Sequence, residues 1–485
     1  MQRTNGSQDD TYTRGLARFI SNIRYEDIPP EVVHRAKLLI LDSIGCGLYA
    51  SQKPWGTILT DTFSELESGG TCTVWGTNRR LTAPHAAFVN GAMVQGFEID
   101  DIHRQAMVHI GCVTVPAVFA IAEIRGPIKG RDFLRSAIAG YETGPRVGQC
   151  VGQEHLGKGW HPTGTIGTFA AAAASSAALR LSEEQTVHAL GLAGSQAAGL
   201  MAVQYGAMMK RGHAGRACQS GLYAAMLAKN GFTGITNVFE SPFGGFCTAF
   251  SQTQDRFDLK ELTAGLGKTF ETMRYGLKFY SSAASTQTAL DALRNIQKKR
   301  SFKPDEVDKI VVYGGQVMMD HTFWKYEPAG ITNSQFNMPF VIATLLLEGD
   351  VFVDEITEEG IRDPKRIALS EKVMFIHDPE VTAMGPKHRY IARVEVHLKN
   401  GTILKDRVEA QRGSEQCFAS DEEVFAKFEN LASRVLTRRQ VDTIRSSVMA
   451  VEKIDNVADL VKELRATPIA IRNREQAVFA PAMVV

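Results

Sequence analysis

The chain has 485 residues, of which 44% are hydrophobic, and its 54 lysines and arginines nearly balance its 53 aspartates and glutamates. This length predicts two domains, or three, and supplies ample apolar material for a large core. A formal net charge of +1 favours neither nucleic acid nor a membrane surface as the main partner.

Cysteine usage and the chain ends bear on the cellular compartment. The seven cysteines are dispersed without a C-x-x-C pair, which predicts reduced, buried thiols in an intracellular protein and argues against an iron–sulfur cluster. The polar N-terminal segment lacks the apolar stretch of a secretory signal, and the C-terminal A-P-A-M-V-V is not a peroxisomal signal. We therefore expect a cytoplasmic protein.

Residues 14 to about 265 are predicted to form one helix after another, with no segment that alternates convincingly as a strand would. Residues 31–48 place apolar side chains at helical spacing directly after a proline pair. The alanine-rich run 168–181 is too short to cross a bilayer, which takes roughly 20 residues, so we expect a buried, closely packed helix. Ser182, followed by two glutamates, is the predicted N-cap of the next helix.

The pattern changes after Gly265. Residues 309–317 are dense in β-branched side chains, and residues 390–398 alternate apolar and polar before a turn at Lys399-Asn400-Gly401. Between these two predicted strands, residues 339–349 are typical of an apolar helix.

From Ser420 onward the sequence is again helical and charged, with Ser420 as a predicted N-cap and acidic residues in the first turn. We therefore predict a mostly α protein with an α+β part. Residues 1–267 and 411–485 would form a large helical domain, and residues 268–410 a smaller α+β lid domain.

The densest group of titratable side chains lies in the segment 98–111, E-I-D-D-I-H-R-Q-A-M-V-H-I-G. It holds three carboxylates and two histidines between two segments with the pattern of core helices. Such a cluster is what acid–base chemistry in a cleft requires. The rest of the chain offers no nucleotide loop, metal box or redox motif.

Several motifs spread over the chain resemble those of the MmgE/PrpD family. They are G-F-E-I-D-D-x-H with a histidine eight residues after the second aspartate, V-P-A-V-F-A-x-A-E, Y-E-T-G-P-R-V-G (141–148), G-W-H-P-T-G (159–164), Q-Y-G-A-M-M-K-R (204–211), F-G-G-F (243–246) and L-K-F-Y (277–280). The likeness is strongest to the fungal members that decarboxylate cis-aconitate. It implies a large helical domain with a small α+β lid, a homodimer, and chemistry without a cofactor or metal ion.

Five residues carry the catalytic expectation. The resemblance places His109 at the family's active-site histidine, where it would protonate the allylic anion left by decarboxylation. Glu98 would orient His109 or bind a substrate hydroxyl or carboxyl group, and His161 would bind substrate or transfer a proton. Lys210 and Lys278 would neutralise a tricarboxylate and stabilise the developing anion. Without the resemblance, a core histidine and a turn histidine are the ordinary alternatives for His109 and His161.

Four neighbouring polar residues, Asp100, Asp101, His103 and Arg211, are expected to bind substrate. For the two aspartates, capping of the following helix or pairing with Arg104 is at least an equal alternative.

Two positions near the expected site depart from the family pattern. Gln287 stands where relatives usually carry a histidine, and Phe340 where the lid helix usually carries a tyrosine. We count both positions among those that bind substrate. The stretch 281–285, S-S-A-A-S, is also small where relatives often carry cysteine or histidine, and Ala283 and Ala284 would leave space. These changes predict a substrate that is bulkier and less polar than cis-aconitate, such as an alkyl-substituted homologue from a secondary pathway.

The sequence thus predicts a lyase that decarboxylates cis-aconitate, or an alkyl-cis-aconitate, to an itaconate-type acid. Dehydration of 2-methylcitrate or a 2-alkylcitrate by the same residues is the rival enzyme hypothesis, and an isomerase or epimerase is a third. A non-catalytic acid-binding homologue is the non-enzyme alternative, although burying unused charges is costly. The expected partners are a small tricarboxylate and a second copy of the chain, without nucleic acid or membrane.

Overall fold

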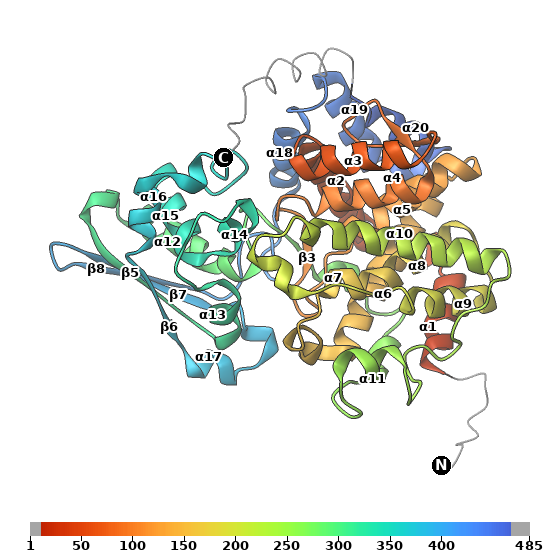
Figure 1. Ribbon diagram of the computed structural model, residues 1–485, viewed down its shortest axis with the longest axis horizontal. Coiled ribbons are helices and arrows are strands. Elements are labelled where there is room, and N and C mark those ends of the chain that lie inside the picture. Colours follow the sequence, from red (N-terminus) through yellow and green to blue (C-terminus); the bar gives the residue numbers. More distant parts are fainter. Residues whose placement is uncertain (1–10, 467–485) are drawn as a thin grey trace.

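The computed structural model describes residues 11–466, apart from the side chains of residues 153, 154 and 386. A helical part and an α+β part lie side by side (Figure 1). This architecture confirms the predicted fold class. The terminal signals considered above, and both ends of the predicted helical domain, lie outside the described residues.

The helical part combines the first half of the chain with its C-terminal helices. Its helices are α1 (Tyr12–Asn22), α2 (Pro30–Ala50), α3 (Pro54–Leu66), α4 (Ala83–Val94), α5 (Gly111–Arg125), α6 (Gly130–Gly157), α7 (Pro162–Thr165), α8 (Gly167–Ala178), α9 (Glu183–Gly194), α10 (Met209–Lys229), α11 (Phe246–Ser251), α18 (Asp421–Ala432), α19 (Arg438–Met449) and α20 (Val457–Glu463). The chain kinks inside α6 at Gly152, whose backbone is not helical.

The α+β part is built around one four-stranded sheet in the order β6-β5-β7-β8. β5 pairs parallel with β6, while the β5–β7 and β7–β8 pairs are antiparallel. Its elements are β5 (Val307–Gly314), β6 (Val373–His377), β7 (Ala392–Leu398), β8 (Ile403–Val408), α12 (Gln287–Lys299), α13 (Gln316–Thr322), α14 (Ile331–Phe336), α15 (Met338–Glu348), α16 (Pro364–Ser370) and α17 (Pro379–Ala383). The predicted hairpin at residues 399–401 joins β7 to β8.

Small residues let the central helices approach closely. The predicted alanine-rich helix is α8, which is buried and packs against α5, α6, α9 and α10. A Cβ at Gly221 of α10 would lie 2.4 Å from the Cβ of Ala171 and 2.5 Å from the backbone nitrogen of Ala172, both on α8. Gly215 meets α4 in the same way, 2.3 Å from the carbonyl oxygen of Phe88. These contacts hold α10, which carries part of the site described below.

The C-terminal helices pack against the beginning of the chain. α18 and α19 contact α2, and α20 contacts α5 (Figure 1). Lys427 on α18 forms a buried ion pair of 2.6 Å with Asp42 on α2. The predicted N-caps are both confirmed, because the side chains of Ser182 and Ser420 each complete a capping box at the start of α9 and α18.

Two sequence predictions need correction. The segment from residue 14 to about 265 contains three short strands: β1 (Cys72–Thr73) pairs with β2 (Arg80–Leu81), and β3 (Asp101–His103) pairs with β4 (Tyr275–Leu277), which lies beyond this segment. Strands of two or three residues are too short to produce an alternating pattern.

Cys417 is exposed, whereas the other six cysteines are buried free thiols. Within residues 11–466, no helix is both long and apolar enough to cross a bilayer.

The close contact between α8 and α10 makes a testable prediction. Gly221→Ala should lower the free energy of unfolding by about 1–3 kcal/mol, because the added methyl group meets backbone that cannot move aside. Gly157→Ala is the matched control, since nothing lies within 4 Å of a Cβ there. Denaturant unfolding measures both variants. Equal stability of Gly221→Ala and the wild type would show that the two helices can separate at little cost.

Candidate active site

A short antiparallel ladder brings two distant segments of the chain to one place. β3 pairs with β4 so that Asp101 lies opposite Leu277, and Lys278 follows directly at the end of β4. Glu98 and Asp100 precede β3, and Lys210 lies in the first turn of α10. The predicted titratable segment and both predicted lysines therefore meet at the junction of the helical and α+β parts.

Two carboxylates and two ammonium groups form a buried network at this junction, and all four side chains are at most 3% exposed. The Nζ of Lys210 donates to Oε1 of Glu98. The Nζ of Lys278 lies 3.4 Å from Oε2 of Glu98 and 3.4 Å from Oδ1 of Asp100. Each buried charge therefore has a partner, which is the condition for tolerating charges in a protein interior.

The network keeps its carboxylates ionised. Burial alone would raise the pKa of Glu98, but Lys210 and Lys278 outweigh it and hold that pKa below its ordinary value. Burial likewise opposes ionisation of Asp100, and His109 and Lys278 hold the pKa of that carboxyl below its ordinary value. Burial lowers the pKa of Lys210, and Glu98 limits the fall.

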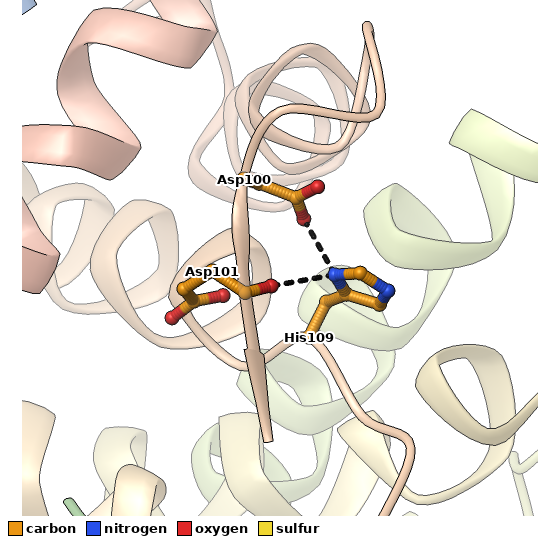
Figure 2. Close-up of side chains that lie close together, drawn as sticks. All are labelled: Asp100, Asp101 and His109. Carbon is orange, nitrogen blue, oxygen red and sulfur yellow. Dashed lines mark hydrogen bonds and ion pairs between the residues drawn. The ribbon is translucent and has the colours of Figure 1, made fainter. Parts of the chain in front are cut away.

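His109 is held by its Nδ1 edge. The Nδ1 atom lies 2.6 Å from the backbone carbonyl oxygen of Asp101 and 3.1 Å from Oδ2 of Asp100 (Figure 2). Because a carbonyl oxygen only accepts, Nδ1 carries a proton and donates it. Figure 2 shows that Nε2 points away from both aspartates. The ring is thus fixed, and Nε2 is the nitrogen left for chemistry, with a carboxylate behind it that stabilises an imidazolium ion.

Asp101 caps the helix that follows the segment. Its Oδ2 and Oδ1 atoms lie 3.1 and 3.3 Å from the backbone nitrogen of Gly111, the first residue of α5. The observed contact therefore matches the alternative in which Asp101 caps the following helix. Burial, with the neighbouring Asp100 and Asp42 carboxylates, raises the pKa of Asp101 to about 8. A Cβ at Gly111 would lie 2.2 Å from the hydroxyl oxygen of Ser43 and 3.0 Å from Oδ2 of Asp101, so any larger residue would have to displace the side chains around this cap.

The potential ligand atoms of Asp100, Asp101 and His109 also lie close enough together to hold a metal ion. Their potential ligand atoms already have protein partners: Nδ1 of His109 is protonated, the Asp101 carboxylate caps α5, and Asp100 faces the ammonium of Lys278. A cation would have to displace these contacts next to a lysine. The arrangement fits a proton-donating histidine better than a metal ion.

His161 is the residue directly before α7. Its Nδ1 lies 3.0 Å from Nδ1 of His213 on α10. Burial, together with the nearby Lys210, puts the pKa of His161 well below its ordinary value and lowers that of His213 to about 4. Both rings are therefore neutral near pH 7, one donating to the other.

These side chains surround a pocket of about 590 Å³, part of which is open to solvent. All five residues expected to be catalytic line it: Glu98, His109, His161, Lys210 and Lys278. Apolar side chains and two small residues form much of the remaining wall: Ile102, Met107, Leu156, Met201, Val317, Phe336, Ala283 and Ala284. An outer pocket of about 1100 Å³ shares part of this wall and leads outward.

The α+β part contributes polar groups that sequence reasoning missed. His321 of α13, Arg389 and Tyr390 line the pocket. The Nδ1 of His321 lies 3.2 Å from the hydroxyl oxygen of Ser285, another lining residue. Nothing in the local sequence distinguishes them from surface residues, because the fold alone brings them to the site.

Four expected substrate-binding residues are held outside the pocket lining by protein contacts. Asp100 lies behind His109, and Asp101 caps α5. The Nε2 of His103 lies 2.9 Å from Glu271, and Arg211 donates to the carbonyl of Gly96 and to Gln335. Arg104 pairs with Glu415 at 3.4 Å rather than with either aspartate. Glu98 pairs with the two lysines. Asp100 contacts the His109 ring and so has the orienting role expected for Glu98.

The two departures from the family pattern also lie outside the lining. The side-chain amide of Gln287 donates to the backbone carbonyls of Tyr280 and Ser282. Phe340 stacks on Tyr326 with ring centroids 4.5 Å apart. Substrate contact by these two residues is therefore not supported by the geometry, whereas Ala283 and Ala284 do face the pocket.

Backbone strain is concentrated at the site. Four non-glycine residues among the described ones have positive φ, and two of these, Glu98 and Met107, each at 58°, line the pocket. Such conformations cost about 1–3 kcal/mol each and persist where the surroundings hold them. At Glu98, the surroundings that hold the backbone include the ion pairs of its carboxylate with Lys210 and Lys278.

The chain is similar to known proteins over most of its length. The MmgE/PrpD N-terminal domain model matches residues 14–258, and the C-terminal domain model matches residues 280–453. A cis-aconitate decarboxylase-like protein of Aspergillus oryzae is 34% identical, over 95% of this chain and 98% of its own length. A cis-aconitate decarboxylase of Aspergillus terreus is 29% identical, over 93% and 95%.

A more distant relative is a mitochondrial 2-methylcitrate dehydratase of Yarrowia lipolytica, 22% identical over 82% of this chain and 78% of its own length. Both family models and the full-length relatives agree, and this chain belongs to the MmgE/PrpD family.

Proposed function

We propose that this protein is a carboxy-lyase that works without a cofactor and decarboxylates cis-aconitate, or an alkyl-substituted cis-aconitate, to an itaconate-type acid. The observation that carries the proposal is the fixed His109, whose Nδ1–H is held by Asp100 and the Asp101 carbonyl while Nε2 remains for the substrate. The names of the relatives from two Aspergillus species support the same reaction.

The reaction needs a proton donor and charge stabilisation. The bond between the methylene carbon and its carboxylate breaks, and its electron pair forms a new C=C bond as carbon dioxide leaves. The electrons of the original C=C bond take a proton at the far allylic carbon from Nε2 of the His109 imidazolium, which solvent then reprotonates. Lys210 and Lys278 stabilise the anion that develops, and the N–H of neutral His161 donates a hydrogen bond to a substrate carboxylate.

The wall of the pocket supports an alkylated substrate. Ala283 and Ala284 leave space next to the charged end, and Met107, Leu156 and Met201 continue from the inner into the outer pocket. An alkyl chain attached to the acid would follow this apolar wall, where its burial contributes about 0.8 kcal/mol per methylene group.

The proposal also covers the domain organisation, the oligomeric state, the cellular location and the metabolic role of the enzyme. Residues 1–267 and 411–485 would act as the body and residues 268–410 as the lid. The chain would form a homodimer, for which four exposed apolar side chains near the pocket mouth offer a surface: Leu200, Tyr205, Met208 and Met209. The buried free cysteines support a cytoplasmic location, and an alkylated substrate supports a role in secondary metabolism.

Dehydration of 2-methylcitrate or a 2-alkylcitrate is the alternative, favoured by the likeness to the Yarrowia lipolytica dehydratase. The neutral His161–His213 pair would then supply the base. A non-catalytic acid-binding protein is the remaining alternative.

Product analysis tests the proposal. The purified protein receives cis-aconitate, an alkyl-cis-aconitate and an alkylcitrate in deuterated buffer, and products are identified by NMR and mass spectrometry. We expect release of carbon dioxide and one deuterium in the product, with faster turnover of the alkylated acid. Loss of water from the alkylcitrate alone would move the protein to the dehydratases, and binding without turnover would make it a non-catalytic homologue.

His109→Gln tests the proton donor. The amide keeps a donor toward Asp100 but cannot deliver a proton, so kcat should fall by about 10²–10⁴-fold with a smaller change in KM. His188→Gln on α9, outside the pocket lining, is the control and should keep kcat. Steady-state assays give both constants. A His109→Gln enzyme within threefold of the wild type would assign the proton to another group.

A further inference from the structure

The charges that line the pocket are not all balanced. Lys210 and Lys278 have carboxylate partners in Glu98 and Asp100. Arg389 is different, because among residues 11–466 no ion pair joins it to a carboxylate, although only 6% of the residue is exposed. A buried charge without a counter-ion is unfavourable unless a ligand supplies one. Arg389 is therefore the cation of the pocket that a bound anion would neutralise.

Arg389 is held in place by neutral groups. Its Nη2 donates to the backbone carbonyl of Arg104, and its guanidinium lies 4.9 Å from the ring centroid of Tyr390. Its buried Nε has no hydrogen-bond partner. These contacts position a planar donor group and leave part of its hydrogen-bonding capacity unused, which suits the fork geometry that binds carboxylates.

Arg389 lies where the inner pocket meets the outer pocket, so it would contact the part of a ligand that is nearer the outer pocket. It lines both the inner and the outer pocket, and so does His321. The Nε2 of His321 is likewise buried without a hydrogen-bond partner, while Nδ1 contacts the Ser285 hydroxyl. Burial and the neighbouring Lys210 and Arg389 lower the pKa of His321 to about 4, so its ring is neutral near pH 7. A charged and a neutral polar group from the α+β part thus meet at the boundary of the two pockets.

We propose that Arg389 binds a carboxylate of the substrate that is retained in the product, with His321 as a neutral hydrogen-bonding neighbour. The inference rests on the proposed function in taking the ligand to be a polycarboxylic acid. The carboxylate is a retained one, because an arginine bound to the departing carboxylate would stabilise the ground state more than the transition state and slow the reaction. Arg389 would then fix the outer end of the acid while the Glu98–Lys network and His109 act on the inner end.

Binding of propane-1,2,3-tricarboxylate, measured by calorimetry, tests this assignment without turnover. Arg389→Gln should raise the Kd of this saturated tricarboxylate by about 30-fold or more, the loss typical of a buried charge partner. Arg389→Lys keeps the charge but not the fork, so its Kd should rise less, by about 3- to 10-fold. Melting temperatures of all variants, without ligand, report any general loss of stability.

Arg366→Gln is the matched control. Arg366 is also an arginine of the α+β part with 7% exposure, but it pairs with Glu348 outside the pocket lining. Its Kd should stay within threefold of the wild type. Equal Kd for Arg389→Gln and the wild type, equal weakening by Arg389→Gln and Arg366→Gln, or no binding by the wild type would each overturn the inference.

Two outcomes remain distinct from these. Should Arg389→Gln not fold, Arg389→Lys decides, and an unchanged Kd in that variant overturns the assignment. Should the wild type bind the tricarboxylate through Arg389 but release no carbon dioxide from cis-aconitate, the assignment holds and the proposed decarboxylation fails.

Discussion

The interaction on which the site depends is the buried network of Glu98 and Asp100 with Lys210 and Lys278. It joins the segment before β3, the end of β4 and the start of α10, so three distant stretches of chain must be folded before any of these charges is satisfied. Removing one partner of a buried pair typically costs about 3–5 kcal/mol. The network therefore holds the junction together and at the same time sets the electric field around His109.

The rest of the molecule supports this junction. The α8–α10 contact through Gly221 sets the position of the helix that carries Lys210, and the β3–β4 ladder sets that of Lys278. The α+β part closes the pocket from the other side with Ser285, His321 and Arg389. The helical part thus contributes Glu98, Asp100, His109 and Lys210 to a charge-balanced centre that Lys278 completes, while the α+β part contributes an arginine without a carboxylate partner. This division of labour suits an acid with a reacting end and a bound end.

Sequence reasoning succeeded where a pattern is local. Helix α2, the capped helices at Ser182 and Ser420 and the β7–β8 hairpin follow from spacing, caps and turns within a few residues. It failed where partners are distant: β3 and β4 are three residues each and lie far apart in the chain. The pocket residues His321 and Arg389 carry no local signal, and the contacts of His103 with Glu271 and of Gln287 with backbone appear only in the folded chain.

The most direct measurement is a crystal structure of the protein with propane-1,2,3-tricarboxylate bound. We expect the ligand in the inner pocket, with Nε2 of His109 within about 3–3.5 Å of one of the carbon atoms of the ligand's chain. Lys278 would contact one carboxylate, and Arg389 another. A ligand confined to the outer pocket, or one whose carbon atoms face away from His109, would contradict the assignment of this histidine as the proton donor.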